Sequence, residues 1–172
     1  MSDEAALSAP ALPETPYETP QRGCRIVSKP AGHILQILAP PFAAGVESRL
    51  IELTGGDAHA LRGAGPGVWR LVGEASLTPQ DIADREARLG PQVHIIDQTH
   101  GRVRLEISGA GAVRLLATGA AIDLSPPRFP VGSACETQFG RIGIHLARTG
   151  ADRFELLVGR SYAMALWEEL TS

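Results

Sequence analysis

The sequence is poor in the residues that define several classes of protein. Its 172 residues include two cysteines, Cys24 and Cys135, which form neither a Cys-x-x-Cys motif nor a metal-ligand spacing. A disulfide-rich scaffold is therefore excluded; we expect reduced thiols, with one Cys24–Cys135 disulfide as the alternative. No apolar run approaches the roughly 18 residues that a membrane-spanning helix needs. The acidic N-terminus also differs from a secretory signal, so we expect a cytoplasmic protein.

Lysine is scarce as well. Lys29 is the single lysine, although lysine and arginine together number 16, and the formal net charge of -3 gives no general attraction to nucleic acid or an anionic membrane. Two interpretations of the arginine bias remain open. It reflects a GC-rich genome, or it places arginines in interfaces, where a planar, weakly hydrated guanidinium is favoured over an ammonium group.

The first 22 residues are expected to lie outside the folded domain. Pro10, Pro13, Pro16 and Pro20 punctuate this segment, which has little apolar surface to bury. We expect residues 1–22 to form a flexible or extended tail, either a solvated leader or an arm that wraps a partner subunit. Residues 23–172 are then the folded domain.

Short elements with the periodicities of strands and helices alternate irregularly through that domain. Strands are predicted at 33–38, 68–72, 93–97, 102–108, 141–148 and 153–159. Helices are predicted at 42–53, 79–89, 109–120 and after Ser161, whose hydroxyl is expected to cap the closing helix. The glycine-rich stretch 55–67 is expected to be a loop. This order predicts an α+β protein with mostly antiparallel sheets, in two lobes at about 23–97 and 98–172.

The predicted strand 102–108 alternates strictly. Val103, Leu105 and Ile107 define an apolar face, and Arg102, Arg104 and Glu106 define a polar one. Similarly, Val113, Leu116 and Ala117 are expected on the inward side of the helix at 109–120.

The stretch "HIIDQTHGRV" (94–103) contains a possible His94–Asp97–His100 cluster. A spacing of three residues would need a helix to bring these side chains together, whereas the surrounding pattern favours a strand followed by a turn. We therefore interpret Asp97 and Thr99 as residues that stabilise a turn. A metal site here is not expected.

Other patterns also lack the features of an active site. The glycines at 63–67 have no phosphate-loop lysine, Gly109 and Gly111 lack the third glycine of a dinucleotide fold, and Ser133 is not in a nucleophile elbow. No cofactor-binding or metal-binding residue is predicted.

A wider pattern resembles the gamma subunit of heterotetrameric sarcosine oxidase. It covers residues 65–170 well and 24–64 in outline. The matching positions are Gly65, Pro66, Trp69, Leu71, Val72, Asp97, Gln98, Thr99, Gly109, Asp123, Leu124, Thr137, Arg160, Ser161, Ala163, Leu166 and Trp167.

This family is similar to the folate-binding aminomethyltransferase of glycine cleavage, which implies an aminomethyltransferase-like fold of two interlocked lobes. The transferase's catalytic carboxylate corresponds to Asp123, the single catalytic candidate in this chain. Asp123 is also open to interpretation as the end of a turn before "SPP". The transferase's later acidic pair is replaced by Ile144 and His145.

The resemblance implies a complex with alpha, beta and delta subunits in which the gamma chain is non-catalytic and contacts mainly alpha. FAD is expected on beta, NAD and tetrahydrofolate on alpha, FMN between alpha and beta, and zinc on delta. The complex would demethylate sarcosine to glycine, with hydrogen peroxide and formaldehyde or methylenetetrahydrofolate. The alternatives are a related N-methylglutamate dehydrogenase and a free-standing folate-binding aminomethyltransferase-like protein.

Overall fold

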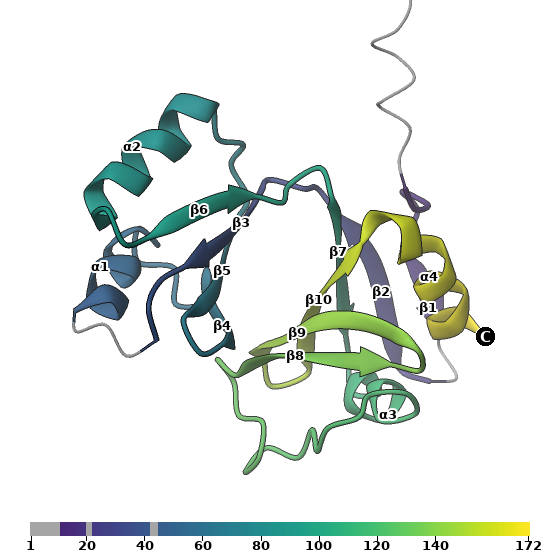
Figure 1. The fold of residues 1–172 in the computed structure, drawn as a ribbon. Coiled ribbons are helices and arrows are strands. Elements are labelled where there is room, and N and C mark those ends of the chain that lie inside the picture. Colours follow the sequence, from purple (N-terminus) through teal and green to yellow (C-terminus); the bar gives the residue numbers. More distant parts are fainter. Residues whose placement is uncertain (1–10, 20–21, 42–44) are drawn as a thin grey trace, which may run out of the picture.

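The structure, a computed structural model, describes residues 11–19, 22–41 and 45–172 and contains two antiparallel sheets (Figure 1). The six-stranded sheet has the order β1-β2-β7-β10-β9-β8. Its strands are β1 (Tyr17–Thr19), β2 (Cys24–Lys29), β7 (Arg102–Ser108), β8 (Ala134–Phe139), β9 (Ile142–Gly150) and β10 (Arg153–Gly159). The four-stranded sheet has the order β4-β5-β3-β6. Its strands are β3 (His33–Leu38), β4 (Leu61–Gly65), β5 (Val68–Gly73) and β6 (His94–Asp97).

Each sheet has its own helices and hydrophobic core. Helices α1 (Val46–Glu52) and α2 (Pro79–Leu89) cover the four-stranded sheet, where Leu35, Ile37, Leu50 and Leu89 are buried. Helices α3 (Ala112–Leu116) and α4 (Ala163–Thr171) belong to the larger lobe. Its core includes the predicted apolar face of β7. The α+β class and the two-lobed arrangement are therefore confirmed.

Local sequence signals account well for α2. The Thr78 hydroxyl accepts a hydrogen bond from the Asp81 N–H at 3.2 Å, and the Asp81 carboxylate accepts one from the Thr78 N–H at 2.8 Å. This reciprocal capping box, with Pro79 at the first helical position, fixes the start of the helix. Gly90 ends it with a φ of 95°.

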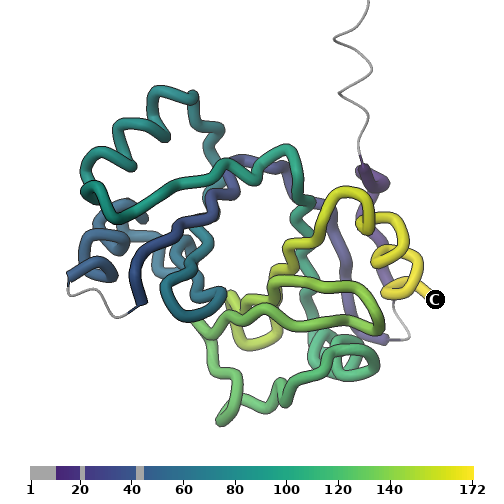
Figure 2. Tube along the Cα trace, viewed as in Figure 1, coloured from purple at the N-terminus to yellow at the C-terminus, as the bar shows by residue number. Residues whose placement is uncertain are grey.

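The chain crosses between the sheets twice, once from β2 to β3 and once from β6 to β7, and Figure 2 shows the two crossings side by side. Hydrogen bonds join the second crossing to β3, because Gln98 N–H donates to the Ile34 carbonyl at 2.8 Å and Ile34 N–H donates to Thr99 Oγ1 at 3.1 Å. Leu157 of β10 is also fully buried against Ile34 and Val72 of the other sheet. The lobes are thus joined by the two crossings and by apolar contact between the sheets.

The predicted N-terminal boundary is wrong for the described part of the tail. Tyr17–Thr19 pairs with β2 as an edge strand, and Leu12 is 3 % exposed in the larger core. The Tyr17 hydroxyl donates to the Thr171 carbonyl at 3.0 Å, and the Tyr17 ring contacts Trp167 edge-on. Residues 1–10, 20 and 21, also assigned to the tail, lie outside the described residues.

The first predicted lobe, 23–97, also begins too early in the chain. β2 pairs with β7, so residues up to Lys29 belong to the six-stranded sheet. The second crossing lies between β6, which ends at Asp97, and β7, which begins at Arg102.

Three local predictions also need correction. Residues 61–65 form β4 within the expected glycine-rich loop, because they pair with β5 around an irregularity between Gly63 and Gly65. Ser161 lies inside a 3₁₀ turn, Arg160–Tyr162, and does not cap α4. Ala117 is exposed, and Leu115 takes the inward position beside Leu116. For the helix predicted at 42–53, residues 42–44 lie outside the described residues, and Val46 and Leu50 are buried as expected.

The first crossing depends on Gly32, so Gly32→Ala is expected to destabilise the chain strongly. Gly32 has a φ of +57°, and a Cβ there would lie 2.0 Å from the Gly73 carbonyl oxygen. Gly55 is a matched control, since its φ is +62° and a Cβ would meet nothing within 4 Å. Gly55→Ala should cost about 1–2 kcal/mol for the left-handed backbone alone. Gly32→Ala should lower the free energy of unfolding by about 1–3 kcal/mol more than Gly55→Ala, because the backbone at Gly73 must move away from the new Cβ. Urea unfolding measures both, and equal costs would contradict the argument.

Candidate functional site

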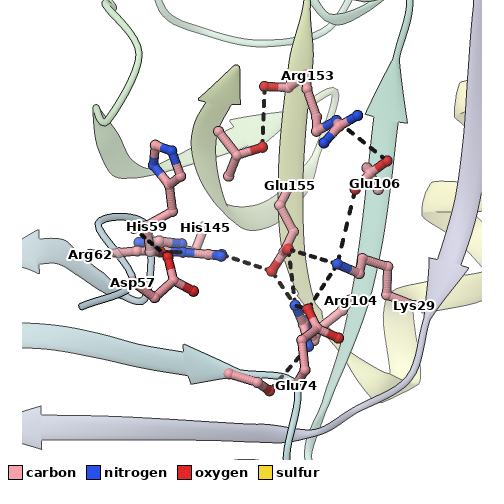
Figure 3. Close-up of polar contacts among 12 residues, drawn as sticks. Lys29, Asp57, His59, Arg62, Glu74, Arg104, Glu106, His145, Arg153 and Glu155 are labelled. Atoms are coloured by element: carbon pink, nitrogen blue, oxygen red, sulfur yellow. Dashed lines mark hydrogen bonds and ion pairs between the residues drawn. The ribbon is translucent and has the colours of Figure 1, made fainter. Parts of the chain in front are cut away.

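A group of buried charges lies between the two lobes and is centred on Glu155 of β10 (Figure 3). Glu155 Oε1 accepts hydrogen bonds from Arg62 Nη1 at 2.8 Å and Arg104 Nε at 3.1 Å, and Oε2 accepts one from Arg104 Nη2 at 3.1 Å. Arg62 comes from the four-stranded sheet and Arg104 from β7 of the larger sheet. The ion pair between Glu155 and Arg62 therefore joins the two lobes.

This arrangement holds Glu155 in its ionised form. Burial alone would raise the pKa of its carboxyl, but the Arg62 charge and the hydrogen bonds from Arg104 and Arg62 lower the pKa to about 2. A carboxylate with so low a pKa cannot serve as a general acid or base near neutral pH. In this structure Glu155 is the ionised partner of Arg62 and Arg104.

Lys29 and Glu74 extend the group toward solvent. Lys29 Nζ donates to Glu74 Oε1 at 2.9 Å and lies 4.0 Å from both Glu155 Oε2 and Glu106 Oε2. Arg104 Nη2 also donates to Glu74 Oε1, at 2.8 Å. The hydrogen bond from Lys29, followed by the hydrogen bond and charge of Arg104, lowers the pKa of Glu74 despite some desolvation.

A second polar group lies between β5 and β8. Arg70 is 5 % exposed and donates from Nε and Nη2 to Glu136 Oε1, at 3.2 and 2.9 Å, and from Nη1 to Gln36. Beside it, the fully buried His145 hydrogen-bonds through Nε2 to the Gly63 carbonyl at 3.1 Å. Its Nδ1 has no hydrogen-bond partner within the described part of the chain. Burial lowers the pKa of His145 to about 4, so its imidazole is neutral at pH 7.

The predicted catalytic candidate, Asp123, lies elsewhere. Its carboxylate is exposed and accepts the Ser125 N–H at 2.9 Å, a hydrogen bond that lowers the pKa of Asp123. This geometry is that of an Asx turn and agrees with the turn interpretation. Ile144 and His145, which replace the transferase's acidic pair, are both buried.

The His94–Asp97–His100 residues do not converge on a common site. His94 lies on β6 with its Nδ1 3.4 Å from Glu86, whereas Asp97 Oδ1 accepts the Thr99 N–H at 2.9 Å. The expected turn contact is thus present. Across residues 11–19, 22–41 and 45–172, no group of three or more His, Cys, Asp or Glu side chains is arranged to hold a metal.

The two cysteines are free thiols. Burial, and to a smaller extent Glu136, raises the pKa of Cys135, which disfavours the reactive thiolate. Cys24 is buried in the larger core.

A cavity of about 490 Å³ opens near the ends of the crossings, beside the buried charges. Glu14 is the one carboxylate in its lining, which does not include Asp123. The residues present do not fit a folate site with Asp123 as its catalytic group, and no chemical step through folate follows from this geometry.

Sequence reasoning missed Arg62, Arg70 and Glu155 as members of a connected interior group. Their signal was the presence of charged residues inside otherwise apolar strand segments such as "VWRLV" and "RFELLVG". None of the helices in the described residues is long and apolar enough to span a membrane.

The fold defines an aminomethyltransferase-like α+β protein. Aminomethyltransferase T of the glycine cleavage system from Bartonella henselae superposes with a TM-score of 0.59 at 18 % identity, over 86 % of this chain and 45 % of the transferase. The chain from the heterotetrameric sarcosine oxidase of Corynebacterium sp. U-96, in complex with pyrrole 2-carboxylate, superposes with a TM-score of 0.75 at 23 % identity. That superposition covers 89 % of this chain and 84 % of the other.

Sequence comparison identifies the family. Sarcosine oxidase subunit gamma from Arthrobacter sp. is 29 % identical over 160 residues, covering 91 % of this chain and 76 % of the relative. The subunit from Corynebacterium sp. (strain U-96) is 27 % identical over 163 residues, covering 94 % and 77 %. Residues 53–172 match the sarcosine oxidase, gamma subunit family. The chain belongs to this family, as the sequence pattern predicted.

Proposed function

We propose that this chain is a non-catalytic gamma subunit of a heterotetrameric sarcosine oxidase. Family membership is the observation that carries the proposal. The site geometry supports it, since the Glu155 carboxylate is held ionised by Arg62 and Arg104 and the His145 imidazole is fully buried. In this proposal the chain contributes packing surface to an oxidoreductase whose chemistry occurs on other subunits.

The finer assignments follow the family resemblance. The proposal assigns FAD to beta, NAD and tetrahydrofolate to alpha, FMN to the alpha–beta boundary and zinc to delta, with alpha as the main contact of this chain. It places the complex in the cytoplasm. The substrate is sarcosine, which is converted to glycine with hydrogen peroxide and formaldehyde or methylenetetrahydrofolate.

Co-expression tests the proposal. This chain, tagged and expressed with the neighbouring subunit genes, should co-purify with three other proteins as a complex that oxidises sarcosine. The chain alone should show no activity, and omission of its gene should reduce the yield of assembled enzyme. Elution of this chain alone, while active flavoenzyme assembles without it, would overturn the proposal.

Asp123→Asn is expected to leave the activity of that complex within about twofold of wild type. The side-chain oxygen of the introduced asparagine can accept the same Ser125 N–H, so the turn is preserved. A catalytic acid or base would contribute about 10²–10⁴ to the rate. A loss of that size in folate-dependent product formation, with assembly intact, would instead favour the aminomethyltransferase-like alternative.

A further inference from the structure

The cavity near the crossings has the size and lining of a small-molecule site. Its volume of about 490 Å³ lies in the range typical of ligand pockets, about 300–1,000 Å³. Leu12, Pro30 and Val103 supply apolar surface, and Ser28 and Thr99 supply hydroxyl groups. Thr99 Oγ1 already accepts the Ile34 N–H, which leaves the hydroxyl proton available for donation to a ligand.

Positive charge dominates the lining. Lys29, Arg102, Arg104 and Arg160 all contribute, against the single carboxylate of the exposed Glu14. Lys29 and Arg104 are already paired within the protein, since Lys29 contacts Glu74, and Arg104 contacts Glu74 and Glu155.

Arg102 differs from those two residues. Its Nε donates to Gln98 Oε1 over a long 3.4 Å, and no carboxylate among the described residues lies within 4.0 Å of its guanidinium. Burial, followed by the nearby charge of Arg70, lowers the pKa of Arg102, against an opposing effect of Glu136. A partly buried guanidinium with no carboxylate in direct contact favours an incoming anion, and its planar donor pair matches the two oxygens of a carboxylate.

We propose that this cavity binds a carboxylate through Arg102, with the aliphatic part of the ligand against Leu12 and Val103. The carboxylate belongs either to a free short-chain acid or to an acidic side chain of an assembled subunit. Both sources present the same chemistry to the cavity.

Glutarate is a suitable probe, detected by saturation-transfer difference NMR on the full chain at pH 7. Wild-type chain should bind glutarate, and the neutral isostere glutaramide should bind at least about tenfold more weakly. Arg102→Gln should weaken glutarate binding by about tenfold or more, and Arg102→Lys, which keeps the charge, by less. Arg141→Gln is the matched control, because Arg141 is exposed on the β8–β9 turn and outside the cavity lining.

The same titration on the co-expressed complex separates the two sources, with the Arg102→Gln complex as reference for binding elsewhere. Retained Arg102-dependent binding indicates a free acid. Its loss on assembly indicates that a partner's carboxylate fills the cavity. Unchanged affinity in a folded Arg102→Gln chain, equal binding of glutaramide, or no binding of glutarate by the wild-type chain would overturn the proposal.

Discussion

Glu155→Ala should lower the free energy of unfolding of the full chain by about 3–5 kcal/mol at pH 7, the cost typical of breaking a buried ion pair from one side. The substitution leaves the Arg62 and Arg104 side chains, 6 % and 2 % exposed, without their shared carboxylate. Exposed Glu74 still contacts Arg104, but Arg62 loses its ion-pair partner. Since small domains are stabilised by only about 5–15 kcal/mol, the variant should unfold at much lower urea concentration.

Glu18→Ala provides the control for this experiment. It removes another glutamate–arginine pair, Glu18 with Arg25 at 3.6 Å, whose side chains are 70 % and 47 % exposed. Surface pairs of this kind contribute about 0–1 kcal/mol, so the urea midpoint should move little. If Glu155→Ala and Glu18→Ala cost the same, the buried group does not stabilise the lobe interface in the way its geometry indicates.

The alternation in β7 predicted the strand and its apolar face, but not the environment of its polar face. Alternation shows only that successive side chains point to opposite sides of a sheet. Arg104 is almost fully buried because the other lobe lies over that polar face, and this depends on residues about 40 and 50 positions away, Arg62 and Glu155. A local sequence window contains no such information.

The preference for arginine over lysine did indicate that some charged side chains lie in an interface. One interpretation of the single lysine was that arginines occupy interfaces, and Arg62, Arg70 and Arg104 do lie between the two lobes of this chain. The interface is internal, and its guanidinium groups make the multiple hydrogen bonds that an ammonium could not reproduce in the same geometry.

The N-terminal strand was unpredictable for a related reason. β1 has three residues, too few to show a period of two, and the prolines around it favour a tail. It is ordered by contacts with Thr171 and Trp167, about 150 residues away. The Asp97–Thr99 turn, in contrast, was predictable because its stabilising hydrogen bond joins residues two positions apart.

His145 should make the stability of the chain depend on pH between about 6.5 and 4. In the unfolded chain a histidine takes up a proton near pH 6.5, whereas burial lowers the pKa of folded His145 to about 4. Above pH 6.5 both states are neutral and the stability is fully present. As the pH falls toward 4, the unfolded state binds the proton and gains stability, which costs the folded chain about 3 kcal/mol.

Urea unfolding at pH 7, 6, 5 and 4 measures this loss, and His145→Gln should remove most of it. A glutamine amide can still donate to the Gly63 carbonyl but does not titrate. His94→Gln, which removes an exposed imidazole, should keep the wild-type pH dependence. The window is distinct from that of Glu155, whose lowered pKa of about 2 contributes stability above about pH 4.5 that is lost only as the pH falls toward 2. An unchanged slope between pH 6.5 and 4 in His145→Gln would show that His145 does not cause the pH dependence, against its complete burial on β9 beside the Gly63 carbonyl.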